Sequence, residues 1–183
     1  LVTPFTAAFV TRPMTDETRA RRSFETHDAF ERRGTDEFAV TTTPFDSAVR
    51  TADEDSDGET GGDAAVTVRL PTLDAVVAGE TVAAVVEDGW YETLERRLDD
   101  VHTVARVDDA APPEIERSGD EVVLTVSFST TPAPEDALAV AEYAEGTWVQ
   151  GIVPGYDYRE PAAGLIDRAR QNYDEGEGET ERR

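Results

Sequence analysis

Four consecutive residues near the end of the chain carry side chains that suit a ligand site: Tyr156, Asp157, Tyr158 and Arg159. Their phenol hydroxyls, carboxylate and guanidinium offer hydrogen bonds and both signs of charge within one short segment. Ligand pockets often combine aromatic walls with a few polar groups of this kind. The sequence therefore predicts a candidate binding site at residues 156–159, with packing and turn roles as the alternative.

Proline and glycine on either side of this segment predict where one helix ends and the next begins. Pro154 breaks a helix and Gly155 permits a positive φ angle, so the pair can end the helix that carries Trp148. Pro161 suits the first turn of a following helix. These roles explain the flanks and leave residues 156–159 without a turn role.

The acidic stretch DEDSDGETGGDA, residues 53–64, matches part of a metal-binding motif. Asp53, Asp55 and Asp57 occupy positions 1, 3 and 5 of a calcium loop. The twelfth position usually supplies a bidentate glutamate, but here it is Ala64, and the flanking residues predict strands rather than helices. Because such strings arise easily in an acidic chain, the sequence favours a solvated loop, and we predict no metal ion and no cofactor.

Several classes of catalytic chemistry lack their residues in this sequence. The chain has no cysteine, which excludes thiolate nucleophiles, cysteine zinc sites and disulfides. Its two histidines, His27 and His102, lie far apart and lack the H-E-x-x-H spacing. No G-x-S-x-G turn, P-loop or G-x-G-x-x-G motif is present. We therefore predict no catalytic residue and favour a non-enzymatic role.

Charge dominates the composition. The chain has 40 acidic and 17 basic residues, a formal net charge of −23, and every basic residue is an arginine. The acid excess remains when the loop 52–63 and the tail 174–183 are set aside, so it is spread over the body of the protein. At molar salt the Debye length falls to roughly 3 Å, which screens the repulsion between surface carboxylates. This composition predicts a cytoplasmic protein of an extreme halophile.

The same composition limits the classes of partner. Nucleic acid binding needs a basic footprint, and the arginine clusters here do not exceed the pairs at 21–22, 32–33 and 96–97. No apolar run approaches the roughly 18 residues that a membrane span needs. We therefore expect a protein partner or a homodimer, with neither nucleic acid nor a membrane.

Hydrophobic periodicity predicts an α+β fold, in which an antiparallel sheet of about four to five strands has helices packed on it. Helices are predicted at residues 16–33, 73–78, 81–100, 134–148 and from 161 onward. Strands are predicted at 38–49 with a bulge at Pro44, at 64–70, at 101–107, and in a hairpin over 113–129. A single domain at 15–173 follows, between a disordered arm or upstream sequence at 1–14 and a disordered acidic tail at 174–183.

The clearest helix, residues 81–100, has a regular apolar stripe and an internal glycine. The stripe predicted to face the core consists of Val82, Val85, Val86, Trp90, Leu94, Leu98 and Val101. Gly89 lowers helix stability by about 1 kcal/mol relative to alanine, which predicts close packing or a kink at that position.

Four stretches of the chain resemble a known family. FETHDAFER, VTTTPFD, VVEDGWYETLE and EGTWVQGIVPGYDYREP are similar to a haloarchaeal family known as domain of unknown function 5813, and the resemblance covers most of residues 19–171. It implies a cytoplasmic haloarchaeal protein and no particular activity. The order of elements is also loosely similar to secretion-chaperone-like folds, which dimerise and bind peptides, although fold analogy is a weak argument for function.

Two hypotheses for function follow from these observations. The first is a non-enzymatic protein-interaction module, which requires an exposed apolar patch or a sheet edge. The alternative is a small-molecule-binding protein or minor enzyme with a pocket near residues 156–159, which requires those side chains to point into a concave site.

Overall fold

The computed structural model describes residues 16–52 and 64–180. The helices are α1 (Asp16–Glu25), α2 (Leu73–Val76), α3 (Ala84–Leu98), the 3-10 helix η1 (Val101–Val104), α4 (Pro134–Gln150) and α5 (Ala162–Thr180). The strands are β1 (Phe30–Arg32), β2 (Glu37–Val40), β3 (Asp46–Arg50), β4 (Ala64–Pro71), β5 (Glu114–Ser118) and β6 (Glu121–Phe128).

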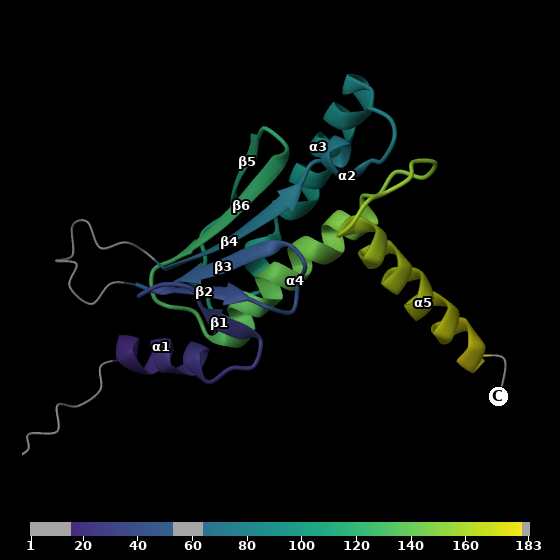
Figure 1. Ribbon diagram of the computed structural model, residues 1–183. Coiled ribbons are helices and arrows are strands. Elements are labelled where there is room, and N and C mark those ends of the chain that lie inside the picture. The colour runs from purple at the N-terminus through teal and green to yellow at the C-terminus, as the bar shows by residue number, and fades with distance from the viewer. Residues whose placement is uncertain (1–15, 53–63, 181–183) are drawn as a thin grey trace, which may run out of the picture.

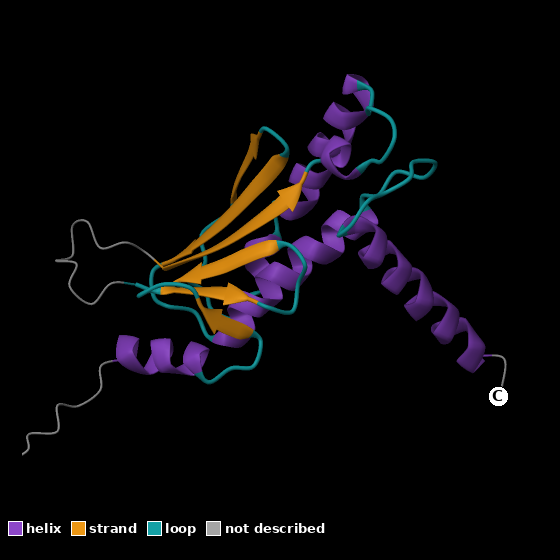
Figure 2. Cartoon of the chain, in the orientation of Figure 1, coloured by secondary structure: helices purple, strands orange, loops and turns teal. Residues whose placement is uncertain are grey.

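The strands form one open antiparallel sheet in the order β1-β2-β3-β4-β6-β5. Helices α3 and α4 lie on one face of this sheet, and α1 lies beside β1 (Figure 2). The opposite face carries no helix of the described residues and is called the open face below. Helix α5 packs against the end of α4 and then runs away from the sheet (Figure 1). The described chain is therefore an α+β protein, as predicted.

Alternation along the central strands places the core between the sheet and the helices. On β6, Val122, Leu124 and Val126 are fully buried, and on β4 Val66 and Leu70 are fully buried too. Their neighbours in sequence point to the open face, as the period of two requires for a sheet covered on one side. The predicted hairpin at 113–129 and the predicted strand at 64–70 are both confirmed.

The aromatic residue Trp148 fixes α4 to the sheet. Its side chain is 1% exposed, and its ring meets Phe45 edge-on with 5.1 Å between the centroids. Its indole N–H donates to the carbonyl oxygen of Pro71, 2.9 Å away, at the end of β4. A buried tryptophan usually finds such a partner, so this contact sets the position of α4 along the strand.

The first predicted helix, residues 16–33, is too long. α1 ends at Glu25, and just beyond it the His27 Nδ1 accepts from the Ala29 N–H while the His27 carbonyl accepts from the Phe30 N–H in a turn. Such local bonds compete with the helix ladder. Phe30 then pairs with a β2 residue as part of β1 rather than continuing the helical stripe.

Two further predictions of elements are wrong. Residues 38–49 form two antiparallel strands, β2 and β3, joined by a loop around Pro44, rather than one bulged strand. Residues 101–107 begin with the 3-10 helix η1 instead of a strand, because the Thr103 hydroxyl bonds back to the Asp100 carbonyl at 2.7 Å. The split hairpin and β1 bring the described sheet to six strands, above the four to five predicted.

The chain ends are described only in part. Helix α5 runs to Thr180, so its backbone includes the first residues of the segment predicted as a disordered tail. The arm predicted at 1–14 lies outside the described residues. Among the helices that the structure describes, none has the length and apolar character needed to cross a bilayer.

Candidate functional site

The loop 156–159 forms an extended segment that docks on the end of α2. Gly155, with φ +101°, makes the turn that precedes it. The prediction that Pro154 and Gly155 end the preceding helix is wrong, because α4 already ends at Gln150 and Gly151 is its C-cap. Tyr158 then forms a β-bridge with Val77. On either side of this bridge, Ala78 N–H donates to the Asp157 carbonyl at 2.8 Å, and Arg159 N–H donates to the Val76 carbonyl at 2.9 Å.

The side chains of this loop have separate contacts. The Tyr158 hydroxyl donates to the Val153 carbonyl at 2.6 Å, and burial raises the pKa of Tyr158. The Arg159 guanidinium donates to the Val77 carbonyl. Tyr156 is half-buried against the core, and Asp157 is exposed. The structure thus gives Tyr158 and Arg159 docking roles within the chain, and a ligand site at residues 156–159 stays a prediction.

A groove lies between α3 and α4. Its first half is an apolar hollow of about 270 Å³. The residues that line it are Val86, Gly89, Trp90, Thr93, Leu94, Arg97, Thr147, Gln150, Gly151 and Val153. The residue Val153, whose carbonyl holds Tyr158, therefore connects the groove with the loop 156–159.

The second half of the groove is a polar hollow of about 550 Å³ that shares Arg97, Thr147 and Gln150 with the first. Its other lining residues are Arg96, Asp100, Tyr143 and Gly146. Both Arg96 and Arg97 are exposed, and neither forms an ion pair with any residue in the described ranges. We call the two hollows together the α3–α4 groove.

Two helix-interior glycines line this groove, and no described residue gives a steric reason for either. At Gly89 of α3 and at Gly146 of α4, an added Cβ would meet no heavy atom within 4 Å, apart from each helix's own nearby backbone. The close packing predicted at Gly89 is therefore wrong, because the position faces open space. The prediction that Val85 faces the core is also wrong, since its side chain is 80% exposed, one helical turn before Gly89 on α3.

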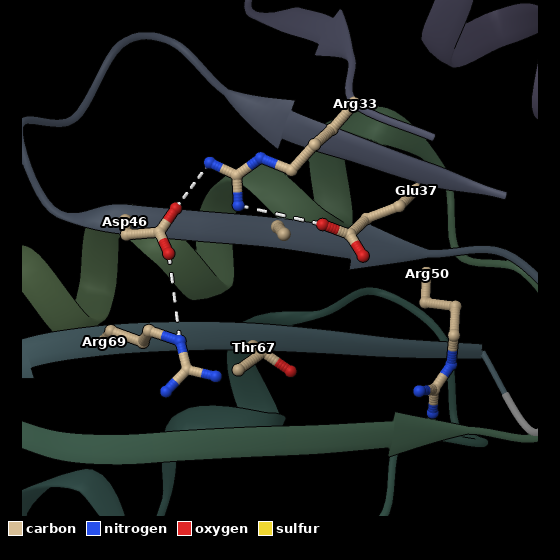
Figure 3. Close-up of a pocket in the computed structure, with 7 residues that line it drawn as sticks. Arg33, Glu37, Asp46, Arg50, Thr67 and Arg69 are labelled. Carbon is tan, nitrogen blue, oxygen red and sulfur yellow. Dashed lines mark hydrogen bonds and ion pairs between the residues drawn. The ribbon is translucent and has the colours of Figure 1, made fainter. Parts of the chain in front are cut away.

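The open face of the sheet carries a separate polar hollow of about 230 Å³ (Figure 3). Its lining residues are Arg33, Glu37, Asp46, Ala48, Arg50, Thr67 and Arg69. The strand register pairs Asp46 with Arg69, so charged side chains of β3 and β4 stand side by side. We call this feature the sheet hollow.

Ion pairs link most of the charged groups in the sheet hollow. Arg33 donates to Asp46 at 2.6 Å, which raises the pKa of the guanidinium. Arg69 lies 3.7 Å from Asp46 and 3.6 Å from Glu121. Since these groups are about half exposed, each pair contributes little to stability, on the order of 0.2–1 kcal/mol.

The stretch that partly matches a calcium loop, which the sequence favours as a solvated loop, has no described structure. Asp53, Asp55 and Asp57 lie outside the described residues. Within the described ranges, the structure brings together no group of three or more histidine, aspartate or glutamate side chains that could hold a metal ion.

The sequence did not point to the groove or to the sheet hollow. The relevant signals were present: Gly89 inside an otherwise regular helix, and the alternation of Asp46, Ala48 and Arg50 on one side of a strand. The strand register and the pairing of α3 with α4 join these residues, and neither follows from local periodicity.

Comparison with known proteins places the chain in a family. The model of a family of unknown function, DUF5813, matches residues 25–168. The chain belongs to this family. The DUF5813 match includes the sheet, both helices of the groove and the loop 156–159. No curated protein and no solved structure matches the chain significantly.

Proposed function

We propose that this DUF5813 protein is a non-enzymatic protein-interaction module whose α3–α4 groove receives a segment of a partner protein. The observation that carries the proposal is the pair Gly89 and Gly146, which line the groove. Each glycine costs a helix about 1 kcal/mol relative to alanine, and no contact with another described residue requires either one. A partner backbone lying in the groove would supply the missing reason.

The lining indicates the chemistry of the partner segment. The hollow beside Trp90 and Leu94 suits an apolar side chain, and exposed Val85 extends the apolar surface. Arg96 and Arg97 suit carboxylates, because guanidinium groups bind them with paired hydrogen bonds. The partner segment is therefore acidic, with an apolar residue as its anchor.

The rest of the molecule supports this choice of partner. A net charge of −23 repels an acidic segment from most of the surface. The binding free energy of such a segment is therefore most favourable where guanidinium groups are unpaired. Consistent with the composition and with the resemblance to haloarchaeal sequences, we propose that this contact forms in a salt-rich cytoplasm. Short, paired hydrogen bonds depend less on screening than long-range attraction does.

A second candidate function rests on the position of Val153. This residue lines the apolar hollow, and its carbonyl accepts from Tyr158. A small molecule in the hollow would lie close to the loop 156–159, as the alternative prediction of a small-molecule-binding protein or minor enzyme requires. Exposed Asp157 is then the side chain of the loop that remains available for a ligand.

The test begins with peptide selection against the full chain in molar KCl. We expect enrichment of short peptides that place an apolar residue next to acidic ones. Gly89→Ala and Gly146→Ala should each stabilise the free protein, by up to about 1 kcal/mol, and yet weaken binding of a selected peptide about tenfold, which corresponds to about 1.4 kcal/mol.

Charge variants complete this test. Arg97→Gln should also weaken peptide binding, whereas Arg168→Gln, an exposed arginine outside the groove, is the matched control. Peptides that bind the glycine variants as well as the parent would contradict the proposal. Loss of a dimer in the glycine variants, measured by light scattering, would instead identify a second copy of the chain as the occupant.

A further inference from the structure

We propose that the sheet hollow is a binding site for a single phosphate monoester dianion, held between Arg50 and Arg69 over Thr67. This site is lined by residues of or next to β2, β3 and β4, whereas the α3–α4 groove is lined by residues of or next to the two helices. The proposal therefore stands on different residues from the proposed function and can fail separately.

The arginines of the sheet hollow differ in how many of their N–H donors are already used. Arg33 donates to Asp46 at 2.6 Å, a short charged hydrogen bond. Arg69, in contrast, approaches its carboxylate neighbours only at 3.6–3.7 Å, beyond the usual hydrogen-bond range. Arg50 has no ion pair and no side-chain hydrogen bond to another residue of the described ranges. Two of the three arginines can thus accept a new anion.

The pairing of β3 with β4 places the donors of the sheet hollow on one face of the sheet. In the β3–β4 register, Asp46 pairs with Arg69, Ala48 with Thr67, and Arg50 with Ala65. Since alternate residues share a face, all these side chains lie on the open face. Figure 3 shows Thr67 between the two arginines, with the Arg50 guanidinium joined to no other drawn residue. The Thr67 hydroxyl adds a further donor at the floor of the hollow.

The sheet hollow is large enough for a single phosphoryl group. Small residues at its floor, Ala48 and Thr67, leave a volume of about 230 Å³, which holds one phosphoryl group and part of the molecule that carries it. The strand register fixes where Arg50, Thr67 and Arg69 start on the open face, and the exposed arginine side chains close on the ligand from there.

The charges on the open face indicate the class of ligand. A phosphate monoester has two negative charges, which match two guanidinium groups, and three terminal oxygens for their forked donors. The neighbouring carboxylates of Asp46, Glu37 and Glu121 disfavour longer polyanions, because further phosphates would meet like charge. A single phosphoryl group therefore fits better than a nucleic acid backbone.

The experiment follows NMR signals of the full chain during titration with anions in molar KCl at constant ionic strength. Inorganic phosphate and O-phosphoserine are the two phosphate probes, and acetate is the carboxylate probe. We expect saturable shifts of the Arg50 and Arg69 Nε signals and of the Thr67 amide with phosphate probes. Tighter binding of O-phosphoserine would indicate an ester ligand rather than the free ion.

Variants separate a binding site from a surface ion-pair network. Arg50→Gln and Arg69→Gln should each weaken phosphate binding tenfold or more, and Arg168→Gln should not. Asp46→Asn removes the nearest carboxylate and should tighten binding several-fold, a gain that no purely structural role predicts. Circular dichroism of each variant checks that the fold is kept.

Three results would overturn the proposal. The first is the absence of saturable shifts with either phosphate probe. The second is unchanged binding in the double variant Arg50→Gln, Arg69→Gln. The third is equal binding of acetate and phosphate, which would remove the assigned ligand class. None of these results bears on the α3–α4 groove, whose test uses peptides and different variants.

Discussion

Among single residues, Glu87 is the carboxylate with the most unusual surroundings. It is 4% exposed, and its oxygens accept from the Asp74 backbone N–H at 3.0 Å and lie 3.4 Å from the Arg117 guanidinium. Burial raises its pKa above the ordinary value near 4.5, although the Asp74 hydrogen bond and Arg117 act in the opposite direction. Glu87 thus joins α2, α3 and β5 through one buried group.

This pKa shift predicts a pH-dependent stability. The folded protein holds the Glu87 proton to a higher pH than the unfolded chain does. Its contribution is therefore full below a pH of about 4.5 and is lost as the pH rises through the raised pKa. The quantity to follow is the difference in the free energy of unfolding between the parent protein and Glu87→Gln. This difference should decrease as the pH rises from about 4.5 through the raised pKa of Glu87.

Denaturant unfolding of both proteins in molar KCl, at a series of pH values, measures the difference. Glu92→Gln, which replaces an exposed glutamate on the same helix, is the matched control. A difference that is constant with pH, or one that grows as the pH rises, would contradict the prediction.

At the next scale, the connection between α2 and α5 depends on the loop 156–159. The β-bridge at Val77 and the Arg159 guanidinium together hold this loop on the end of α2. The sequence could identify the four residues as unusual but could not assign this role, because their partners lie about eighty positions earlier in the chain.

Arg159→Gln tests the docking role of this loop. The variant loses one charged hydrogen bond, worth about 1.5 kcal/mol. Hydrogen exchange of the backbone amides at positions 78 and 159 should become roughly tenfold faster, because both amides donate between the loop and the end of α2. Asp157→Asn changes an exposed side chain in the same loop and serves as the control. Unchanged exchange in Arg159→Gln would indicate that its guanidinium has no docking role.

Long elements were predictable from periodicity, whereas short ones were not. α4 and β6 extend over enough residues for a repeated apolar pattern, and both lie where the sequence predicts them. β1 has three residues and η1 has four, too few to show a period. Phe30 fits a helical stripe equally well, and only pairing with β2 decides its place.

For the whole molecule, net charge should control stability. In dilute buffer, a charge of −23 on a chain of 183 residues favours expansion through self-repulsion. The exposed ion pairs of the sheet hollow are each too weak to offset it. Salt near 1 M shortens the Debye length to about 3 Å and so removes most of the repulsion.

The protein should therefore unfold as salt is removed. Circular dichroism during a KCl titration should show loss of helical signal toward low salt and recovery when KCl is restored. The control is the same titration with sorbitol in place of KCl. Sorbitol is excluded from the protein surface, as a stabilising salt is, but it does not screen charges. A full native spectrum in dilute buffer would contradict the prediction.

Composition alone supports a prediction for the whole molecule, but it supports none for the sites. Net charge is a sum over residues and needs no knowledge of contacts. The groove and the sheet hollow depend instead on which helices and strands become neighbours. Gly89 and Arg50 acquire their roles only when α4 and β4 lie beside them.

The strand order has a consequence for how the nascent chain assembles. β1 to β4 pair with neighbours in sequence, as do β5 and β6, but the two halves of the sheet meet only at the β4–β6 pair. Residues 72–120 lie between these strands and must be synthesised before β6 emerges. Until then β4 presents an unpaired edge, the kind of surface through which incomplete chains aggregate. The slow step of folding should be the closure of this pair, because contacts distant in sequence form late.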